Sequence, residues 1–137
     1  MVITSDHFKA HKVFLDDERF PPDESWTLVK NSRAALILLD GLKQQNIRVD
    51  HMSFDHDLST TDGIDDTSIR VMEWFCEPEN RAFWPKRVYI HTGNPVGEAN
   101  LVAIIRNAMD HGWCDRSTLA GFGFNLWKHE HRAYRKD

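Results

Sequence analysis

The chain has 137 residues, 17 of them basic and 21 acidic, and its formal net charge is −4. This length fits one domain with a substantial core, and the acidic balance argues against broad binding to duplex nucleic acid, which needs a basic surface. No apolar run approaches the ~20 residues of a membrane span and no signal peptide is visible, so we expect a soluble cytoplasmic protein without a membrane partner.

The first half of the chain alternates short apolar runs with one helical pattern. We expect residues 1–11 to be a loose, mostly polar leader. Pro21 and Pro22 place a loop between the first two apolar runs, because proline fits neither a helix interior nor a central strand. The predicted elements are strands over 12–16 and 26–29, a helix capped by Asn31 or Ser32 and ending near Gln45, a strand over 51–55, a polar loop over 59–63 and a helix over 66–76.

The second half continues the same alternation. It contains a strand over 87–90, a helix that opens between Gly97 and Asn100, a weak fifth strand over 118–124 with two glycines, and a polar terminal helix or tail over 125–137. Strands that alternate with helices imply a parallel sheet with right-handed crossovers. We therefore predict a single α/β domain over residues 1–137.

Two acidic clusters follow predicted strands. Asp16 and Asp17 end the first strand, and Asp55 and Asp57 follow the third. In an open α/β sheet, ligands bind beyond the carboxyl ends of the strands, and carboxylates that converge there repel one another unless a divalent cation, a cationic ligand or a raised pKa relieves them. Oxygen ligands suit Mg²⁺ or Mn²⁺, and Arg19 could orient a carboxylate or grip a phosphate oxygen. The alternative is a solvated loop with an ordinary run of charges.

Two histidines lie beside these strand ends. On a strand, residues two apart share a face, so His56 would point away from Asp55 and Asp57 unless the strand ends at Asp55. In that case His56 could turn into the crevice. His91 follows the strand over 87–90 and could act as a general acid or base, because an unperturbed histidine titrates near neutrality.

Thr92 and Asn94 continue from His91. Thr92 could donate to a phosphate oxygen, and Asn94 could orient a ligand or cap the turn. Gly93 and Gly97 would allow close backbone approach, and the following helix N-terminus favours anions. The alternative is a turn histidine followed by a capping asparagine.

These motifs together resemble the cyclic-phosphate processing receiver-like domain, a family of bacteria and phages. The resemblance covers residues 12 to 105 and is carried by Phe14-Leu15-Asp16-Asp17-Glu18-Arg19, Ser53-Phe54-Asp55-His56-Asp57-Leu58, Ile90-His91-Thr92-Gly93-Asn94, Gly97 and Asn100. It implies a three-layer, flavodoxin-like sandwich with sheet order 2-1-3-4-5, and an action on cyclic phosphate ends of nucleic acids. It also makes Asn100 a candidate for substrate binding.

By position, Asp16 and Asp17 match the metal-binding acidic pair of receiver domains, Asp55 matches the phosphoacceptor, and Thr92 falls near the receiver hydroxyl. Typical receivers lack counterparts of four residues here, which are His56, Asp57, His91 and Asn94. The receiver lysine at the end of strand five has no equivalent within residues 118–124. These departures favour catalysis over phospho-signalling.

The resulting prediction is a metal-dependent phosphoesterase whose substrate is a cyclic nucleotide or an RNA end with a cyclic phosphate. Asp16, Asp17 and Asp55 would hold Mg²⁺ or Mn²⁺. The catalytic candidates are His56, His91 and Asp57, and the substrate-binding candidates are Arg19, Thr92, Asn94 and Asn100. A receiver-type phosphoacceptor module and a noncatalytic nucleotide sponge are the alternatives. The resemblance suggests the cytoplasm of a bacterial host or a phage-infected cell, and a homo-oligomer is left open.

Overall fold

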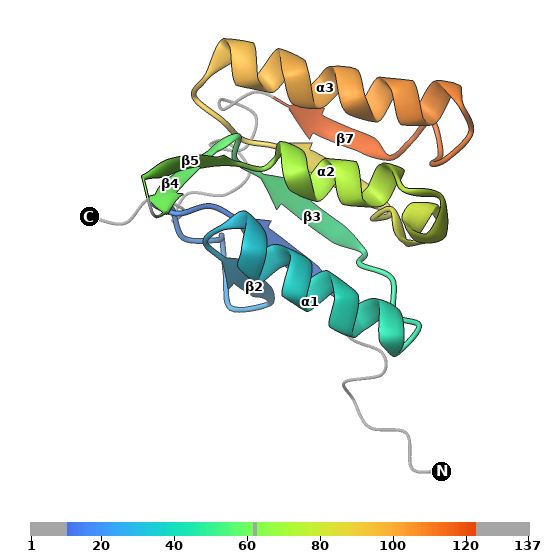
Figure 1. Ribbon diagram of the computed structural model, residues 1–137. Helices are drawn as coiled ribbons and strands as arrows, with labels where there is room; N and C mark the ends of the chain where they lie inside the picture. The colour runs from blue at the N-terminus through green and yellow to red at the C-terminus, as the bar shows by residue number, and fades with distance from the viewer. Residues whose placement is uncertain (1–10, 62, 123–137) are drawn as a thin grey trace.

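A computed structural model describes residues 11–61 and 63–122 (Figure 1). Its centre is a five-stranded sheet in which every neighbouring pair is parallel, with the order β2-β1-β3-β6-β7. This order is the predicted 2-1-3-4-5 once the strands of the main sheet are counted alone, and the weak fifth strand is confirmed. The strands are β1 (Lys12–Leu15), β2 (Trp26–Val29), β3 (His51–Phe54), β6 (Arg87–Ile90) and β7 (Leu119–Phe122).

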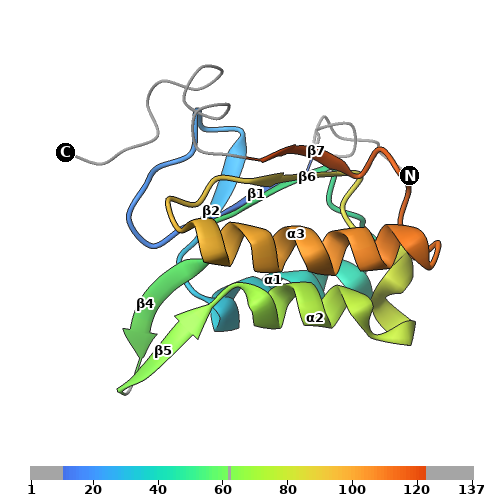
Figure 2. The same ribbon diagram turned by 90° about the horizontal axis from the view of Figure 1, so that it is seen from above.

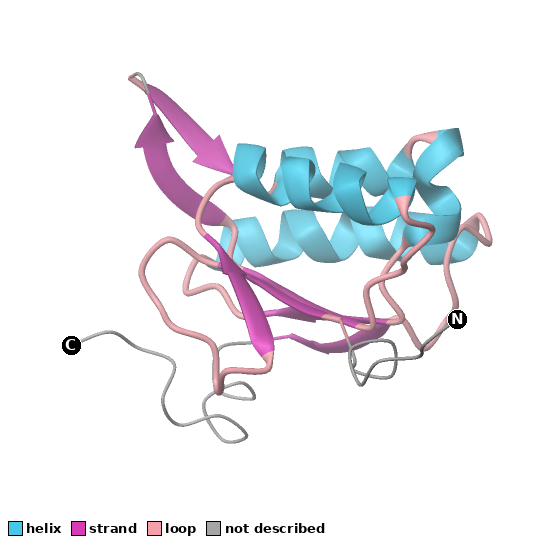
Figure 3. Cartoon of the chain, turned by 90° about the horizontal axis from the view of Figure 1, so that it is seen from below, coloured by secondary structure: helices cyan, strands magenta, loops and turns pink. Residues whose placement is uncertain are grey.

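Three helices pack on one face of this sheet (Figures 2 and 3). They are α1 (Ser32–Gln44), α2 (Ile69–Cys76) and α3 (Pro95–Asp110), and a 3₁₀ helix, η2 (Pro78–Phe83), follows α2. The side chain of Asn31 accepts a hydrogen bond from the amide of Ala34 at 2.7 Å, so Asn31 is the cap of α1. Within the described part of the chain no helix covers the other face of the sheet. Two predictions lie outside the described residues: the terminal helix or tail over 125–137, and the leader over 1–11 except for its last residue.

Alternation along the strands separates two apolar clusters. Val13 and Leu15 of β1 belong to the main core beneath the helices, whereas Phe14 belongs to a smaller cluster with aromatic neighbours from β2 and β6. Successive strand residues point to opposite faces of a sheet, so Ser53 of β3 lies on the same side as Phe14. The face of the sheet that carries Phe14 and Ser53 also carries buried polar groups of the candidate site described below.

An antiparallel hairpin extends from the carboxyl end of β3. Its strands are β4 (Asp57–Thr61) and β5 (Ile64–Thr67), which correct the predicted loop over 59–63 and delay the start of α2 to Ile69. The hairpin projects from the body of the domain (Figure 2). Of its apolar residues, Leu58 is buried in the main core and Ile64 is exposed. Among the described residues, no helix is both long and apolar enough to cross a membrane.

Candidate metal and phosphate site

An open hollow of about 340 Å³ lies at the carboxyl edge of the parallel sheet. The loops after β1, β3 and β6 meet there, as expected for the ligand-binding edge of an open α/β sheet. Its walls are therefore built from three segments that are distant in the sequence. They are Asp17, Glu18, Arg19, Asp55, Asp57, Leu58, Thr92, Gly93 and Asn94.

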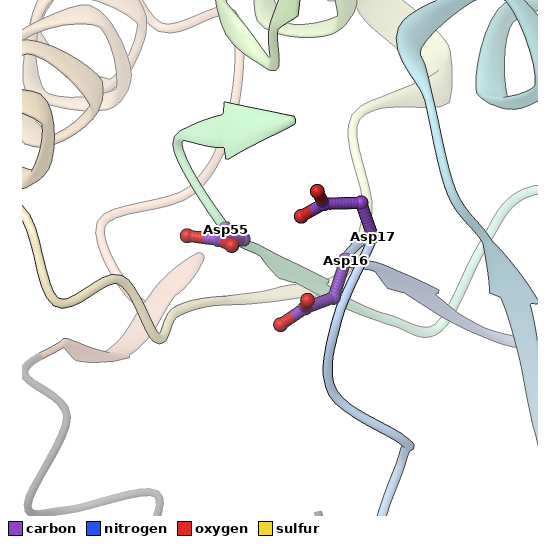
Figure 4. Close-up of side chains that lie close together, drawn as sticks. All are labelled: Asp16, Asp17 and Asp55. Carbon is purple, nitrogen blue, oxygen red and sulfur yellow. The ribbon is translucent and has the colours of Figure 1, made fainter. Parts of the chain in front are cut away.

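Three carboxylates converge at this edge (Figure 4). Leu15 pairs with Phe54 in the register of β1 and β3, so the next residues, Asp16 and Asp55, lie side by side, and Asp17 follows directly. One oxygen from each of the three carboxylates lies within 4.8 Å of the others. A hard cation such as Mg²⁺ or Mn²⁺ takes oxygen ligands from such a set. These donors therefore fit the predicted ion.

Asp16 is completely buried, and both its oxygens accept hydrogen bonds. Oδ1 accepts from the backbone amides of Glu18 and Arg19, each at 2.8 Å. Oδ2 accepts from Nε2 of His91 at 2.9 Å and from Nη1 of Arg19 at 3.4 Å. Burial raises the pKa of Asp16, but the hydrogen bond from His91 and those from the two backbone amides outweigh burial, so the pKa lies below its ordinary value. Asp16 is therefore the member of the group that more readily stays ionised.

Asp55 behaves in the opposite way. Burial and then the negative charge of Asp16 raise its pKa to about 7, against lowering effects from a hydrogen bond with Thr92, from Arg19 and from the amide of His56. Asp55 therefore exchanges a proton near neutral pH in the absence of a metal. A bound cation would favour its ionised form.

His91 is fully buried and lies behind the carboxylates. Its ring stacks on Phe14 with centroids 4.5 Å apart, and its Nδ1 lies 2.6 Å from Oγ of Ser53. Burial lowers the pKa of His91, and Arg19 adds to this effect against the raising influence of Asp16, so we assign a neutral ring. The Asp16 carboxylate only accepts, so Nε2 carries the proton and Nδ1 accepts from the Ser53 hydroxyl. This geometry fits a role in holding Asp16 and does not fit the predicted proton exchange with a substrate.

His56 is also largely buried, and its side chain contacts that of Asp57. Its Nδ1 lies 2.9 Å from Oδ1 of Asp57, whose Oδ2 accepts from Nδ2 of Asn94 at 3.0 Å. Burial raises the pKa of Asp57, but the hydrogen bonds from His56 and Asn94 bring it below its ordinary value. Asn94 in turn caps α3 by accepting from the amide of Gly97 at 3.1 Å. Asp57 is thus an exposed carboxylate that is held by hydrogen bonds to His56 and to Asn94, the cap of α3.

Gly97 has a different role from the one predicted. A Cβ atom placed there would lie 2.4 Å from Cγ of His56, far inside any normal contact distance. The absent side chain therefore makes room for the His56 ring and not for a ligand.

The structure brings most predicted site residues together. Arg19, Thr92 and Asn94 line the hollow with Asp17, Asp55 and Asp57. Asp16, His56 and His91 are buried and are not part of its walls. Asn100 is exposed on α3 and is absent from the walls of the hollow, so the structure does not place this candidate at the site. Two serines were not predicted: Ser53, which holds His91, and Ser59 of the hairpin, whose Oγ donates to Oδ2 of Asp17 at 2.8 Å. Only the spacing of Ser53 two residues before Asp55 offered a signal, since it shares the face of Asp55.

The fold and the acidic edge define a receiver-like α/β domain. Residues 11–107 match the family model of the cyclic-phosphate processing receiver domain, and the chain belongs to this family. No curated protein and no solved structure matches the chain. The family assignment links the domain to the processing of cyclic phosphates.

Proposed function

We propose that the protein is a metal-dependent phosphoesterase that opens a cyclic phosphate, either at an RNA end or in a cyclic nucleotide. The observation that supports this proposal is the convergence of the carboxylates of Asp16, Asp17 and Asp55. It occurs at an open hollow that Asp17 and Asp55 line together with Arg19 and Thr92. Negative ligands for a cation and positive or hydroxyl donors for a phosphate are the two halves of such a site. When bound, Mg²⁺ or Mn²⁺ would polarise a phosphoryl oxygen and make coordinated water more acidic.

The chain's own residues would bind and orient the substrate. The guanidinium of Arg19 offers paired donors to phosphate oxygens, and Thr92 and the Gly93 loop offer hydroxyl and amide donors at the same wall. Asp57 is 61% exposed at its side chain and is held by His56 and Asn94, so it can accept the proton of an attacking water. The water oxygen bonds to phosphorus, the bond from phosphorus to one sugar oxygen breaks, and that oxygen gains a proton from solvent.

Turnover is the direct test. The protein would be incubated with Mn²⁺ or Mg²⁺, an RNA with a 2′,3′-cyclic phosphate end and a panel of cyclic nucleotides, and the products would be weighed by mass spectrometry. We expect a product heavier by one water that disappears with chelator and in Asp55→Asn. Asp110→Asn is the matched control, because Asp110 is an exposed carboxylate paired with Arg116 away from the hollow. Full activity in Asp55→Asn would contradict the proposal, and so would the absence of product from every substrate.

One observation favours a second candidate, a receiver-type phosphoacceptor. Asp55 stands at the end of β3 and is hydrogen-bonded to the Thr92 hydroxyl, as a phosphorylated aspartate would need. The described strand β7 contains no lysine to accompany it. Incubation with acetyl phosphate and Mg²⁺ separates the two: a stable phosphoryl group on Asp55 without turnover of cyclic phosphates supports the phosphoacceptor. Binding of a cyclic nucleotide without consumption would instead indicate a sponge.

A further inference from the structure

Arg19 lies between two of the carboxylates that would bind the cation. Its Nη1 is 3.4 Å from Oδ2 of Asp16 and 3.5 Å from Oδ2 of Asp55, and the three side chains are 14%, 0% and 9% exposed. One guanidinium thus offsets part of the negative charge of two buried carboxylates that would hold a metal.

We propose that Arg19 is an internal substitute for the divalent cation: it bridges Asp16 and Asp55 in the metal-free protein, leaves them when the cation binds, and then binds the phosphate of the substrate. This inference rests on the proposed function, because it assumes that the carboxylates hold a metal. It adds that cation and phosphate binding are coupled through one side chain.

The first argument is the number of acceptor positions on Asp16. A carboxylate oxygen has two lone pairs. Those of Oδ1 are both used by backbone amides, and those of Oδ2 are used by His91 and by Nη1 of Arg19. The amides are fixed by the chain and His91 is fully buried. A metal can therefore reach Asp16 only at the lone pair that Arg19 now uses.

The second argument is the weakness of the contacts that Arg19 would give up. Charge-assisted N–H···O bonds are about 2.7–2.9 Å long, and both contacts of Nη1 are longer than 3.3 Å. A divalent ion carries twice the charge of the guanidinium and binds oxygen at about 2.0–2.1 Å for Mg²⁺. It also repels a positive charge a few ångströms away. Replacement of the Arg19 guanidinium by a divalent cation at these carboxylates is therefore favourable.

The third argument is the place to which Arg19 can turn. A Cβ atom on Gly93 would lie 4.0 Å from Nη2 of Arg19, so the guanidinium already borders the Gly93 loop. Thr92 and Asn94 line the same wall of the hollow. A freed guanidinium there can bind two phosphate oxygens at once. The expected ligand is accordingly a phosphate ester, with inorganic phosphate as its simplest probe.

The test compares Mn²⁺ affinity, read from the spin resonance signal of the free ion, in the wild type and in Arg19→Gln. It is made at about pH 8, where Asp55 is ionised and protons compete least. We expect Arg19→Gln to bind Mn²⁺ about tenfold more tightly and to lose the tightening that inorganic phosphate gives the wild type. Arg33→Gln is the matched control, because Arg33 is an exposed arginine that lines a different hollow. Equal or weaker Mn²⁺ binding in Arg19→Gln would overturn the inference.

A second measurement uses the wild-type chain and does not depend on how the variant folds. In an NMR titration with Mg²⁺, the side-chain Nε–H signal of Arg19 should shift, and added phosphate should shift it again only when Mg²⁺ is present. An unchanged signal at saturating Mg²⁺ would also overturn the inference. If neither protein binds Mn²⁺, the metal site of the proposed function fails too. If the wild type binds Mn²⁺ and opens cyclic phosphates while Arg19→Gln gains no affinity, this inference alone fails.

Discussion

Gly97→Ala tests whether the first turn of α3 is built around His56. Gly97 is the third residue of the helix, where alanine would ordinarily stabilise by about 1 kcal/mol relative to glycine. Here the new Cβ would lie 2.4 Å from Cγ, 2.6 Å from Nδ1 and 2.8 Å from Cβ of His56. Overpacking of this kind costs about 1–3 kcal/mol, and the ring has little freedom because Asp57 holds it. We expect a net loss of about 1 kcal/mol and a lower turnover, since His56 positions Asp57.

Gly41→Ala is the matched control in α1. No atom lies within 4 Å of a Cβ built at Gly41, so alanine should stabilise the protein by about 0.5–1 kcal/mol. Urea unfolding of both variants, followed by circular dichroism, gives the two changes in the free energy of unfolding. If Gly97→Ala is as stable as Gly41→Ala, the packing argument for His56 is refuted.

Three further predictions concern the polar groups. In chelator, the raised pKa of Asp55, about 7, means that the folded state binds a proton that the unfolded state has lost, so this group's contribution to stability falls as pH rises from about 4 to 7. Asp55→Asn should therefore be more stable than the wild type above pH 7, by up to about 4 kcal/mol, and should lose this advantage near pH 4. The measurement is urea unfolding of both proteins at several pH values. A difference in the free energy of unfolding that does not change with pH would show that the pKa of Asp55 is not raised. Ser53→Ala should cost about 1–2 kcal/mol because it leaves Nδ1 of buried His91 without its donor, and an unchanged urea midpoint would contradict this. Asp57→Asn should reduce turnover at least tenfold with less than about 0.5 kcal/mol lost in unfolding, whereas full activity would remove Asp57 from the reaction.

The edge of the site could be predicted from the sequence because the strands are short and buried. Asp16 and Asp55 directly follow apolar runs, and parallel strands bring their carboxyl ends to one edge. The cap of α1 could be narrowed to Asn31 or Ser32 by residue type and position. The β4–β5 hairpin could not be predicted, because it projects from the body of the domain (Figure 2) and Leu58 is the one buried residue among its described side chains. A single buried residue imposes no alternating pattern. The hairpin's one local signal was Asp62-Gly63, a dipeptide typical of hairpin turns.

The roles of the histidines could not be read from the sequence either. His91 follows a strand in the same manner as Asp16 and Asp55, but its side chain is fully buried and bonded to Ser53 and Asp16. The spacing of residues predicts to which face of a sheet a side chain points. It does not predict which other residues bury that side chain. Likewise the missing side chain of Gly97 leaves room for the ring of His56, a residue far away in the chain. Only tertiary contacts reveal which polar side chains face the hollow and which hold those that do.

The most direct test of the account is opening of a 2′,3′-cyclic phosphate in water enriched in the heavy oxygen isotope, with Mn²⁺ present. The account predicts one heavy oxygen in the phosphate of the product, with no incorporation in chelator or in Asp55→Asn. Ring opening that continues at the same rate in chelator or in Asp55→Asn would contradict a metal-dependent phosphoesterase at this site. So would the absence of ring opening by the wild type with this substrate and with cyclic nucleotides alike.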